Sequence, residues 1–401
     1  MSNPEDSLQR IVLRDAEAVL PDRIIRADLV IEGSVIANLA PPGTATGDEI
    51  WDLGGRRVTP GCIDAHIHGV NGIDFSRADA ETIASSAEDL AAMGITTIYP
   101  TIVPGTEQEM VSALRECARA RELSHSILGI HLEGPFVSSG RMGALPAAGI
   151  HSWDEGLFDR LLDGAGGQLR IMTFAPEEVP LDAQRKFATV GVRGSIGHTC
   201  ASAQQTKAAI DAGSWRCTHL CNAMPSIHHR DPGPVIVLLL DERVRCEVIL
   251  DGHHLDDDTV RMALRMKGAA GLMAVSDAMP LTGMGIATGN FCGQEVCSDG
   301  SKATLENGTL AGSVTLLPEA LEKTSDRLGW DASLTSALGA SNAADDLGLP
   351  RRGAIRSDHR ADLVIHSLTA AKAAAVTVLR GGLPVRDPDG PRLPAEMERI
   401  R

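Results

Sequence analysis

The sequence of 401 residues has few aromatic side chains and no long hydrophobic run. Phe, Trp and Tyr make up 3% of it, with a single Tyr, so we expect an aliphatic core and no aromatic platform for a sugar or a base. A transmembrane helix needs about 18 or more consecutive apolar residues. The apolar run at 235–240 stops at Asp241, and no run approaches that length, so no membrane-spanning helix is expected.

Basic residues are scarce relative to acidic ones, with 37 Lys and Arg against 53 Asp and Glu and a formal net charge of −16. A chain this acidic repels nucleic acid and anionic membranes, so neither is an expected partner. A small anionic substrate remains compatible with this charge if a local cluster of positive groups binds it.

The N-terminal residues lack the cationic segment and following apolar segment of a secretory signal. The eight cysteines are scattered along a long chain, which favours free thiols in a reducing compartment. We therefore expect a soluble, cytoplasmic protein.

The two ends of the chain differ in pattern from its middle. Residues 10–56 and the segments 361–367 and 375–385 alternate apolar and polar residues between turns, which predicts strands and one small β domain built from both ends. The middle contains eight short apolar segments that end in polar or small residues, at 58–69, 95–103, 127–136, 169–177, 192–199, 216–224, 245–254 and 271–279. Helical patterns at 81–94, 107–123 and 201–213 lie between them, so we predict a closed (β/α)₈ barrel.

Six of the predicted barrel strands end in residues that suit a metal site. Such residues would meet at the carboxyl-terminal rim, where barrel enzymes place their catalytic groups. They are His66, His68, Glu133, His198, His219, His253, His254 and Asp277. His66 and His68 are two apart on a strand and so share a face, as a divalent metal requires.

Each of these residues also has a structural explanation when taken alone. A pair of histidines two apart, or a lone histidine on an apolar strand, is more often structural than ligating. Glu133 could lie in a surface turn, and Asp277 could form a structural salt bridge, although an unpaired carboxylate in its apolar segment would be costly to bury. The set, on matching strands, favours a metal.

Two further motifs carry weaker signals. Cys217 and Cys221 flank His219, but four residues along a strand span about 13 Å, so both cannot join His219 in one tetrahedral shell. We interpret them as small core residues. The segment 228–231 (HHRD) could be a solvated turn, unless an anionic ligand explains Arg230.

The motifs PGCIDAHIHG, HLEGPF, GHT, THLCNAM, DGHH, SDA and GTLAGS occur in this order and cover roughly residues 58 to 360. In this they resemble the N-acetylglucosamine-6-phosphate deacetylases of the amidohydrolase superfamily. The resemblance implies a (β/α)₈ barrel at 58–352, a small split β-sandwich domain at 1–57 and 353–401, and usually a homodimer. It also implies hydrolysis of the acetyl amide of an amino-sugar phosphate.

The resemblance assigns roles to individual residues. Glu133, His198 and His219 would hold the main metal, and Asp277 would be the acid and base. His66 and His68 are both present, which makes a second metal shared with Glu133 and Asp277 plausible. Zinc is the first expectation for one or two ions, while Fe, Mn, Co or Ni also suit these ligands. The substrate contacts implied are Ala144, Asn222, the main chain of Ala223, the phosphate-binding Arg230, the sugar-contacting His254, and the loop of Leu310, Ala311 and Gly312.

One segment departs from the family pattern. Where the family has Lys-Lys-Gly-Ala-His, with a histidine that touches the substrate, residues 141–145 read RMGAL. His151 could replace that histidine from a differently shaped loop. The departure keeps open the galactosamine epimer or another N-acyl amine as the substrate.

The sequence disfavours two other functions. A non-catalytic metal or sugar-phosphate binding protein does not require a proton acceptor such as Asp277. A cyclic-amide hydrolase would need a metal-bridging lysine, for which the sequence offers no clear candidate.

Overall fold

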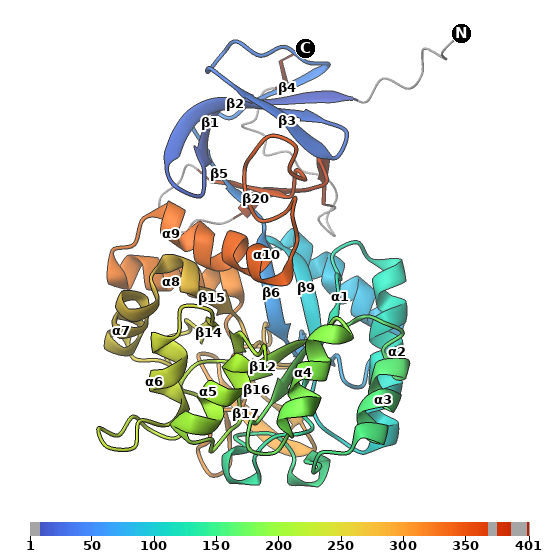
Figure 1. The fold of residues 1–401 in the computed structure, drawn as a ribbon. Coiled ribbons are helices and arrows are strands. Elements are labelled where there is room, and N and C mark those ends of the chain that lie inside the picture. The colour runs from blue at the N-terminus through green and yellow to red at the C-terminus, as the bar shows by residue number, and fades with distance from the viewer. Residues whose placement is uncertain (1–8, 368–374, 386–398, 401) are drawn as a thin grey trace. The chain divides into compact units, whose positions relative to one another are not determined.

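The computed structural model describes residues 9–367, 375–385 and 399–400 (Figure 1). Parts of the predicted small domain, at 1–8, 368–374, 386–398 and 401, lie outside these described residues. The chain divides into two compact units, one of Met1–Ile63, Glu88–Thr96 and Gly329–Arg401, the other of Asp64–Ala87 and Thr97–Leu328. The domain boundaries predicted between residues 57 and 58 and between residues 352 and 353 stay a prediction.

The second unit is built on a sheet of eight strands in the order β15-β14-β13-β12-β11-β10-β9-β6. The pairings from β9 to β15 are parallel, and a parallel bridge between Ile67 and Ala278 joins the two ends of the order. The sheet is therefore nearly closed, and the prediction of a (β/α)₈ barrel is confirmed. Its strands are β6 (Cys62–Ile67), β9 (Ile95–Ile102), β10 (Ile130–Glu133), β11 (Leu169–Phe174), β12 (Arg193–Ile196), β13 (Arg216–Cys217), β14 (Arg245–Ile249) and β15 (Leu272–Val275).

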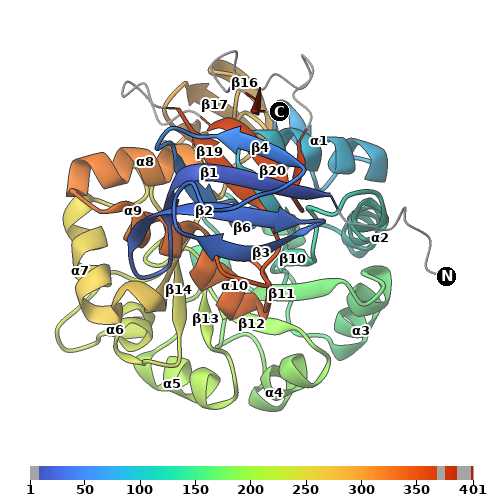
Figure 2. The same ribbon diagram turned by 90° about the horizontal axis from the view of Figure 1, so that it is seen from above.

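Helices surround this sheet (Figure 2). They are α1 (Ala80–Ala92), α2 (Glu107–Leu123), α3 (Glu155–Gly164), α4 (Leu181–Thr189), α5 (Ala203–Asp211), α6 (Gly233–Leu240), α7 (Asp257–Lys267) and α8 (Leu317–Leu328). The three predicted helices correspond to α1, α2 and α5. The start of α2 is fixed by a capping box, in which Thr106 and Glu109 satisfy each other's backbone N–H groups. No helix in the described part of the chain has the length and hydropathy to cross a membrane.

A three-stranded antiparallel sheet interrupts the barrel pattern after β15. It consists of β16 (Ile286–Phe291), β17 (Gln294–Asp299) and β18 (Ala303–Leu305). Phe291 and Val296 from this sheet pack with Leu145 and Met279 in one apolar cluster. The sequence analysis did not predict this sheet.

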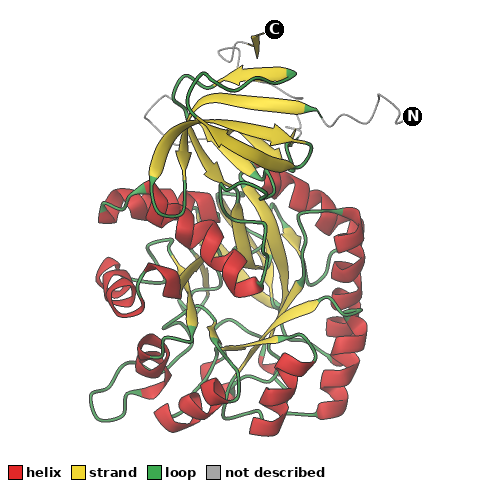
Figure 3. Ribbon diagram, turned by 45° about the horizontal axis from the view of Figure 1, so that its top comes forward, coloured by secondary structure: helices red, strands yellow, loops and turns green. Residues whose placement is uncertain are grey.

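The first unit contains a nine-stranded sheet with contributions from both chain ends (Figure 3). β1 (Arg10–Val19) pairs with β4 along its first half and with β5 along its second half, so the sheet divides there into two branches. The other strands are β2 (Ile24–Glu32), β3 (Val35–Ala40), β4 (Glu49–Asp52), β5 (Arg57–Pro60), β19 (Leu363–His366), β20 (Ala375–Arg380), β21 (Leu383–Pro384) and β22 (Arg399–Ile400). Leu13, Trp51 and Leu363 share its core, so the predicted β domain of both ends is confirmed.

Close packing inside the barrel allows no side chain at Gly197, directly before His198. An added Cβ would lie 2.7 Å from Thr218 Cβ and 2.9 Å from Thr173 Cγ2. We predict that Gly197→Ala destabilises the protein by about 1–3 kcal/mol through overpacking. Thermal unfolding should show this loss, whereas Gly156→Ala, which meets only the ends of exposed side chains, should change stability by less than about 0.5 kcal/mol. Equal melting temperatures for the two variants would contradict the packing argument.

Candidate metal centre

The ends of the barrel strands bring six predicted ligands together. Glu133 is the last residue of β10, and His66 and His68 lie at the end of β6. Three others share one local geometry, because each lies two residues beyond its strand with a positive φ: His198 (46°), His219 (27°) and Asp277 (51°). Such backbone is strained for residues other than glycine and concentrates at functional sites.

The first group consists of Glu133, His198 and His219, all buried. His198 Nε2 lies 3.1 Å from Glu133 Oε1, and His219 Nε2 lies 3.0 Å from the same oxygen. The two Nε2 atoms are 3.0 Å apart. Two imidazoles and a carboxylate at these distances can share one divalent cation.

The second group consists of His66, His68 and Asp277, also buried. The Nε2 atoms of the two histidines are 3.2 Å apart, and Asp277 Oδ1 lies 3.5 Å from the first and 3.3 Å from the second. Glu133 belongs to both groups, since its Oε1 lies 3.4 Å from His66 Nε2 and its Oε2 lies 3.3 Å from His68 Nε2. A carboxylate in this place can bridge two ions.

Hydrogen bonds on the far side of the rings favour a metal between them. Nδ1 of His198 donates to the Arg141 carbonyl at 2.9 Å, and Nδ1 of His68 donates to the Thr101 carbonyl at 3.1 Å. A carbonyl can only accept, so a neutral ring keeps its lone pair on Nε2, facing the other ligands. His66 is held in the same way by Glu247, at 3.0 Å.

The charge of the cluster also suits a cation. Burial lowers the pKa of His68, but its hydrogen bonds to Asp277 and Glu133 raise it to about 9. Burial raises the pKa of Glu133, but His66, His198 and His219 hold it well below its usual range. The carboxylates therefore stay ionised and draw positive charge into a buried space, either as protons or as metal ions. The donor set fits a divalent metal.

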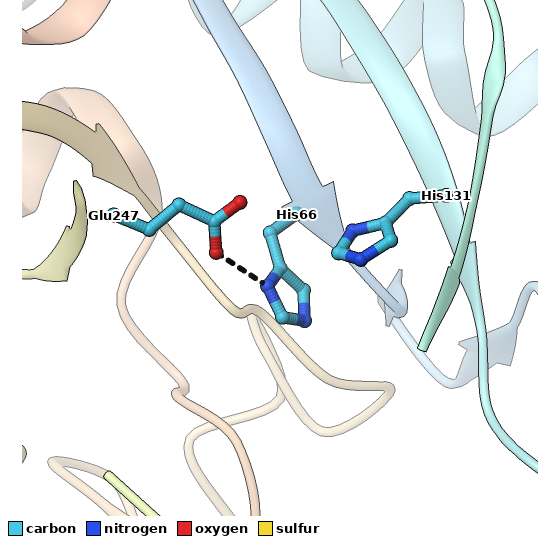
Figure 4. A group of neighbouring side chains, drawn as sticks. All are labelled: His66, His131 and Glu247. Carbon is cyan, nitrogen blue, oxygen red and sulfur yellow. Dashed lines mark hydrogen bonds and ion pairs between the residues drawn. The ribbon is translucent and has the colours of Figure 1, made fainter. Parts of the chain in front are cut away.

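Three buried residues behind His66 were not predicted: Arg216, Glu247 and His131, of which Figure 4 shows the last two. Glu247 and Arg216 form an ion pair, and the edge of the His131 ring packs against His66, with ring centres 4.6 Å apart. The sequence held a signal for two of them, since His131 lies two residues before Glu133 on the same strand face, and Glu247 is a charged residue between the apolar Cys246 and Val248 of its strand. His131 is not free to bind a metal, because its Nε2 lies 2.8 Å from Thr173 Oγ1 and its Nδ1 3.2 Å from the Ala65 carbonyl.

The metal-ligand candidates open into a pocket of about 250 Å³. The candidate ligands that line it are His68, Glu133, His198, His219 and Asp277. Most of the predicted substrate contacts line it as well: Ala144, Asn222, Ala223, His254, Leu310 and Gly312. A larger cavity of about 730 Å³ beside α2 is lined by none of these residues.

Loop 141–145 forms part of the pocket wall. Leu145, at the position where the family pattern has histidine, is buried and lines the pocket next to Phe291. Gln294 fixes the loop by donating its side-chain amide to the Ala144 carbonyl at 2.9 Å. His151 does not replace the missing histidine here, because it does not line the pocket and its Nε2 lies 3.0 Å from the Gly105 carbonyl.

Several predicted residues lie elsewhere. Arg230 is on an exposed loop, with Nη1 2.7 Å from His229 Nε2, and does not line the pocket. Ala311 is buried beside the pocket, where its N–H donates to the Ala303 carbonyl. Cys217 is buried as predicted and Cys221 partly so, and neither belongs to a group of described residues that could bind a metal.

His254 brings a positive group to the pocket. Its Nδ1 lies 2.8 Å from Asp251 Oδ2, and both side chains are nearly inaccessible to solvent. Burial lowers the pKa of His254, but the hydrogen bond and charge of Asp251 outweigh it and raise the pKa above its usual value. The imidazolium form therefore persists to a higher pH than in an ordinary histidine.

The amidohydrolase family profile matches residues 57–386, and the chain belongs to this family of metal-dependent hydrolases. Among its relatives, the N-acetylglucosamine-6-phosphate deacetylase of Bacillus subtilis (strain 168) is 32% identical over 386 residues, 94% of this chain and 97% of the relative. The Mycobacterium smegmatis enzyme of the same name, solved as a mutant with bound N-acetyl-D-glucosamine-6-phosphate, has a TM-score of 0.87 and 31% identity over 94% of this chain and 99% of its own. An N-acetylgalactosamine-6-phosphate deacetylase of Escherichia coli O157:H7 is 29% identical over 89% of this chain and 92% of the relative.

We predict that removing divalent metal with a chelator lowers the melting temperature. Without a metal ion, only protons on the histidines compensate the buried carboxylates, and the binding free energy of the ion is lost. A ligand at 100 times its Kd stabilises a protein by about 3 kcal/mol, which sets the size of the expected loss. Added Zn²⁺ should restore the original melting temperature, and the double variant His198→Asn with His219→Asn should respond less. Metal-free and metal-loaded protein that melt together would contradict the assignment.

Proposed function

We propose that this protein is a metal-dependent deacetylase that hydrolyses N-acetylglucosamine 6-phosphate to glucosamine 6-phosphate and acetate. The observation that carries the proposal is the convergence of two ligand groups, joined by Glu133, on one pocket that Asp277 also lines. The relatives that cover nearly the whole chain bear the names of such enzymes, which supports the substrate class.

The ligands proposed for the main metal are Glu133, His198 and His219, and those for a second ion are His66, His68, Glu133 and Asp277. Zinc is the proposed metal, because histidine with carboxylate is a common zinc ligand set, and Fe, Mn, Co and Ni are the alternatives. A divalent ion bound here would supply Lewis acidity, which polarises the acetyl carbonyl and lowers the pKa of a water to about 7.

Asp277 is proposed as the proton carrier. Burial raises its pKa, but His66 and His68 lower it below its usual value, so the carboxylate is ionised and can accept a proton from the attacking water. As the carbonyl carbon becomes tetrahedral, the C–N bond must break, and an unprotonated nitrogen leaves poorly. Asp277 then donates the proton to that nitrogen, which leaves as the amine.

The remaining pocket residues would bind the sugar phosphate. Asn222, the main chain of Ala223 and His254 line the pocket and are proposed to contact the sugar and its phosphate. Leu310 and Gly312, also in the lining, would border the acetyl group together with the adjacent Ala311. Arg230 is proposed as a further phosphate ligand, although its exposed loop does not line this pocket.

Two properties of the whole protein belong to the proposal. We propose a homodimer, as the family resemblance implies. We also propose a cytoplasmic location, which accords with cysteines scattered along a long chain.

A screen for acetate release tests the function. The substrates are N-acetylglucosamine and N-acetylgalactosamine, each with and without the 6-phosphate, on protein of measured metal content. The glucosamine phosphate should be the best substrate. Preference for N-acetylgalactosamine 6-phosphate would favour a second candidate function, the deacetylation of that epimer. The E. coli O157:H7 relative and the divergent loop 141–145 support this candidate. No acetate from any of them by metal-loaded protein would overturn the deacetylase proposal.

We predict that Asp277→Asn lowers kcat by about 10²–10⁴-fold, the usual contribution of a positioned acid–base group. The ion at Glu133, His198 and His219 should remain, because the asparagine is not among its ligands. Steady-state kinetics and elemental analysis of the same preparation measure the two effects. Near-normal turnover in this variant would exclude the role of proton carrier.

A second prediction concerns pH. Because Asp251 raises the pKa of His254, the imidazolium should hold the phosphorylated substrate well beyond the pH where an ordinary histidine deprotonates. In Asp251→Asn this pKa falls, so KM for the sugar phosphate should begin to rise at a lower pH than in the wild type. KM for the unphosphorylated sugar serves as the control. Superimposable KM profiles for the two proteins would refute the role of His254.

A further inference from the structure

Glu247 lies behind the second ligand group and faces only hydrogen-bond donors. One carboxylate oxygen, Oε2, accepts from His66 Nδ1 at 3.0 Å and from the backbone N–H of His219 at 3.2 Å. The other, Oε1, accepts from Arg216 Nη2 at 2.6 Å and Nε at 3.2 Å. The side chain does not line the pocket, so it cannot touch a substrate there.

We propose that Glu247 is a positioning residue that decides whether the group of His66, His68 and Asp277 holds a second metal ion. The inference rests on the proposed metal-dependent function and concerns the occupancy of one site within it. Glu247 acts by keeping the proton of His66 on Nδ1, so that the lone pair on Nε2 faces His68 and Asp277.

Arg216 makes this arrangement possible. Arg216 and Glu247 come from the adjacent strands β13 and β14. Both side chains are buried, with an exposed fraction of 1% for the arginine and 0% for the glutamate. A buried carboxylate without a partner would be costly, whereas one paired by two N–H groups of a guanidinium is neutralised and fixed in orientation. The ion pair therefore aims the remaining oxygen at His66.

His131 cannot take over this task. It packs edge-on against the His66 ring, but both of its nitrogens have partners of their own, Thr173 Oγ1 and the Ala65 carbonyl. The packing of His131 limits how the His66 ring can tilt. The position of the His66 ring proton therefore depends on Glu247.

The two ligand groups depend on Glu247 to different degrees. At His66 the carboxylate contacts the ligating ring itself, whereas at His219 it contacts only the backbone. His198 and His219 also share Glu133 Oε1 without any contribution from Glu247. Loss of the carboxylate should therefore weaken the second group much more than the first.

In Glu247→Gln an amide NH₂ replaces one of the two accepting oxygens. If the NH₂ faces His66, it donates to Nδ1 and shifts the ring proton to Nε2, where it blocks the metal. If it faces Arg216 instead, His66 keeps only a neutral acceptor. Changes to such outer hydrogen bonds typically weaken metal binding by about 10–100-fold.

The experiment is a titration of metal-free protein with Zn²⁺, followed by calorimetry and by elemental analysis after gel filtration. The wild type should bind two ions, and Glu247→Gln should bind the first normally and the second about 10–100-fold more weakly. Asp362→Asn is the matched control, because it also removes a buried carboxylate held by two arginines, Arg352 and Arg360, but lies in the other unit. It should bind both ions as the wild type does.

If Glu247→Gln fails to fold, the double variant Glu247→Gln with Arg216→Met removes the buried cation together with its counter-charge and should show the same selective loss. Two ions bound with unchanged affinity by either variant would overturn the proposal. A wild type that binds one ion and releases acetate would also overturn it, while the proposed function would stand. A wild type that binds no metal and releases no acetate would instead refute the function itself.

Discussion

The arrangement of this protein depends on one electrostatic constraint: buried ring nitrogens and carboxylate oxygens point at one another at the pocket wall. His198 Nε2 and His219 Nε2 are 3.0 Å apart, and His66 Nε2 and His68 Nε2 are 3.2 Å apart. Lone pairs at such distances repel unless a proton or a metal ion lies between them. A buried divalent cation in each ligand group resolves the contact of that group, and Glu133 belongs to both groups.

The barrel supplies the rigidity that such a cluster needs. The six ligands stand at the ends of five buried strands, with His66 and His68 both at the end of β6, so moving one of them would require moving a packed strand. Strained backbone at His198, His219 and Asp277 turns these side chains toward a common point directly after their strands end. The hydrogen bonds of the sheet below these residues offset the free-energy cost of the strained backbone.

Much of this arrangement could be predicted from the sequence. The eight barrel strands stand out because parallel strands are buried on both faces and form nearly continuous apolar runs. A polar residue at the end of such a run must lie at the rim, which is why Glu133 and Asp277 could be recognised without a structure. The spacing of His66 and His68 places both rings on one face for the same reason.

Other features depend on contacts between distant segments, which a single sequence does not encode visibly. The sheet β16–β18 has ordinary alternating strands, but nothing local indicates that Phe291 reaches the pocket. Glu247 and Arg216 form their ion pair only because β13 and β14 are adjacent strands. The resemblance implies that Arg230 binds the phosphate, but in the structure this residue lies on an exposed loop. Loop 141–145 forms a pocket wall only because Gln294 and Leu145 fix it there.

The most direct test of the central claim is a crystal structure of the metal-loaded protein with anomalous diffraction recorded on both sides of the absorption edge of zinc. The account predicts an anomalous peak between Glu133 Oε1, His198 Nε2 and His219 Nε2, with a second peak beside His66, His68 and Asp277. Anomalous peaks at other positions only, in protein that releases acetate, would contradict it.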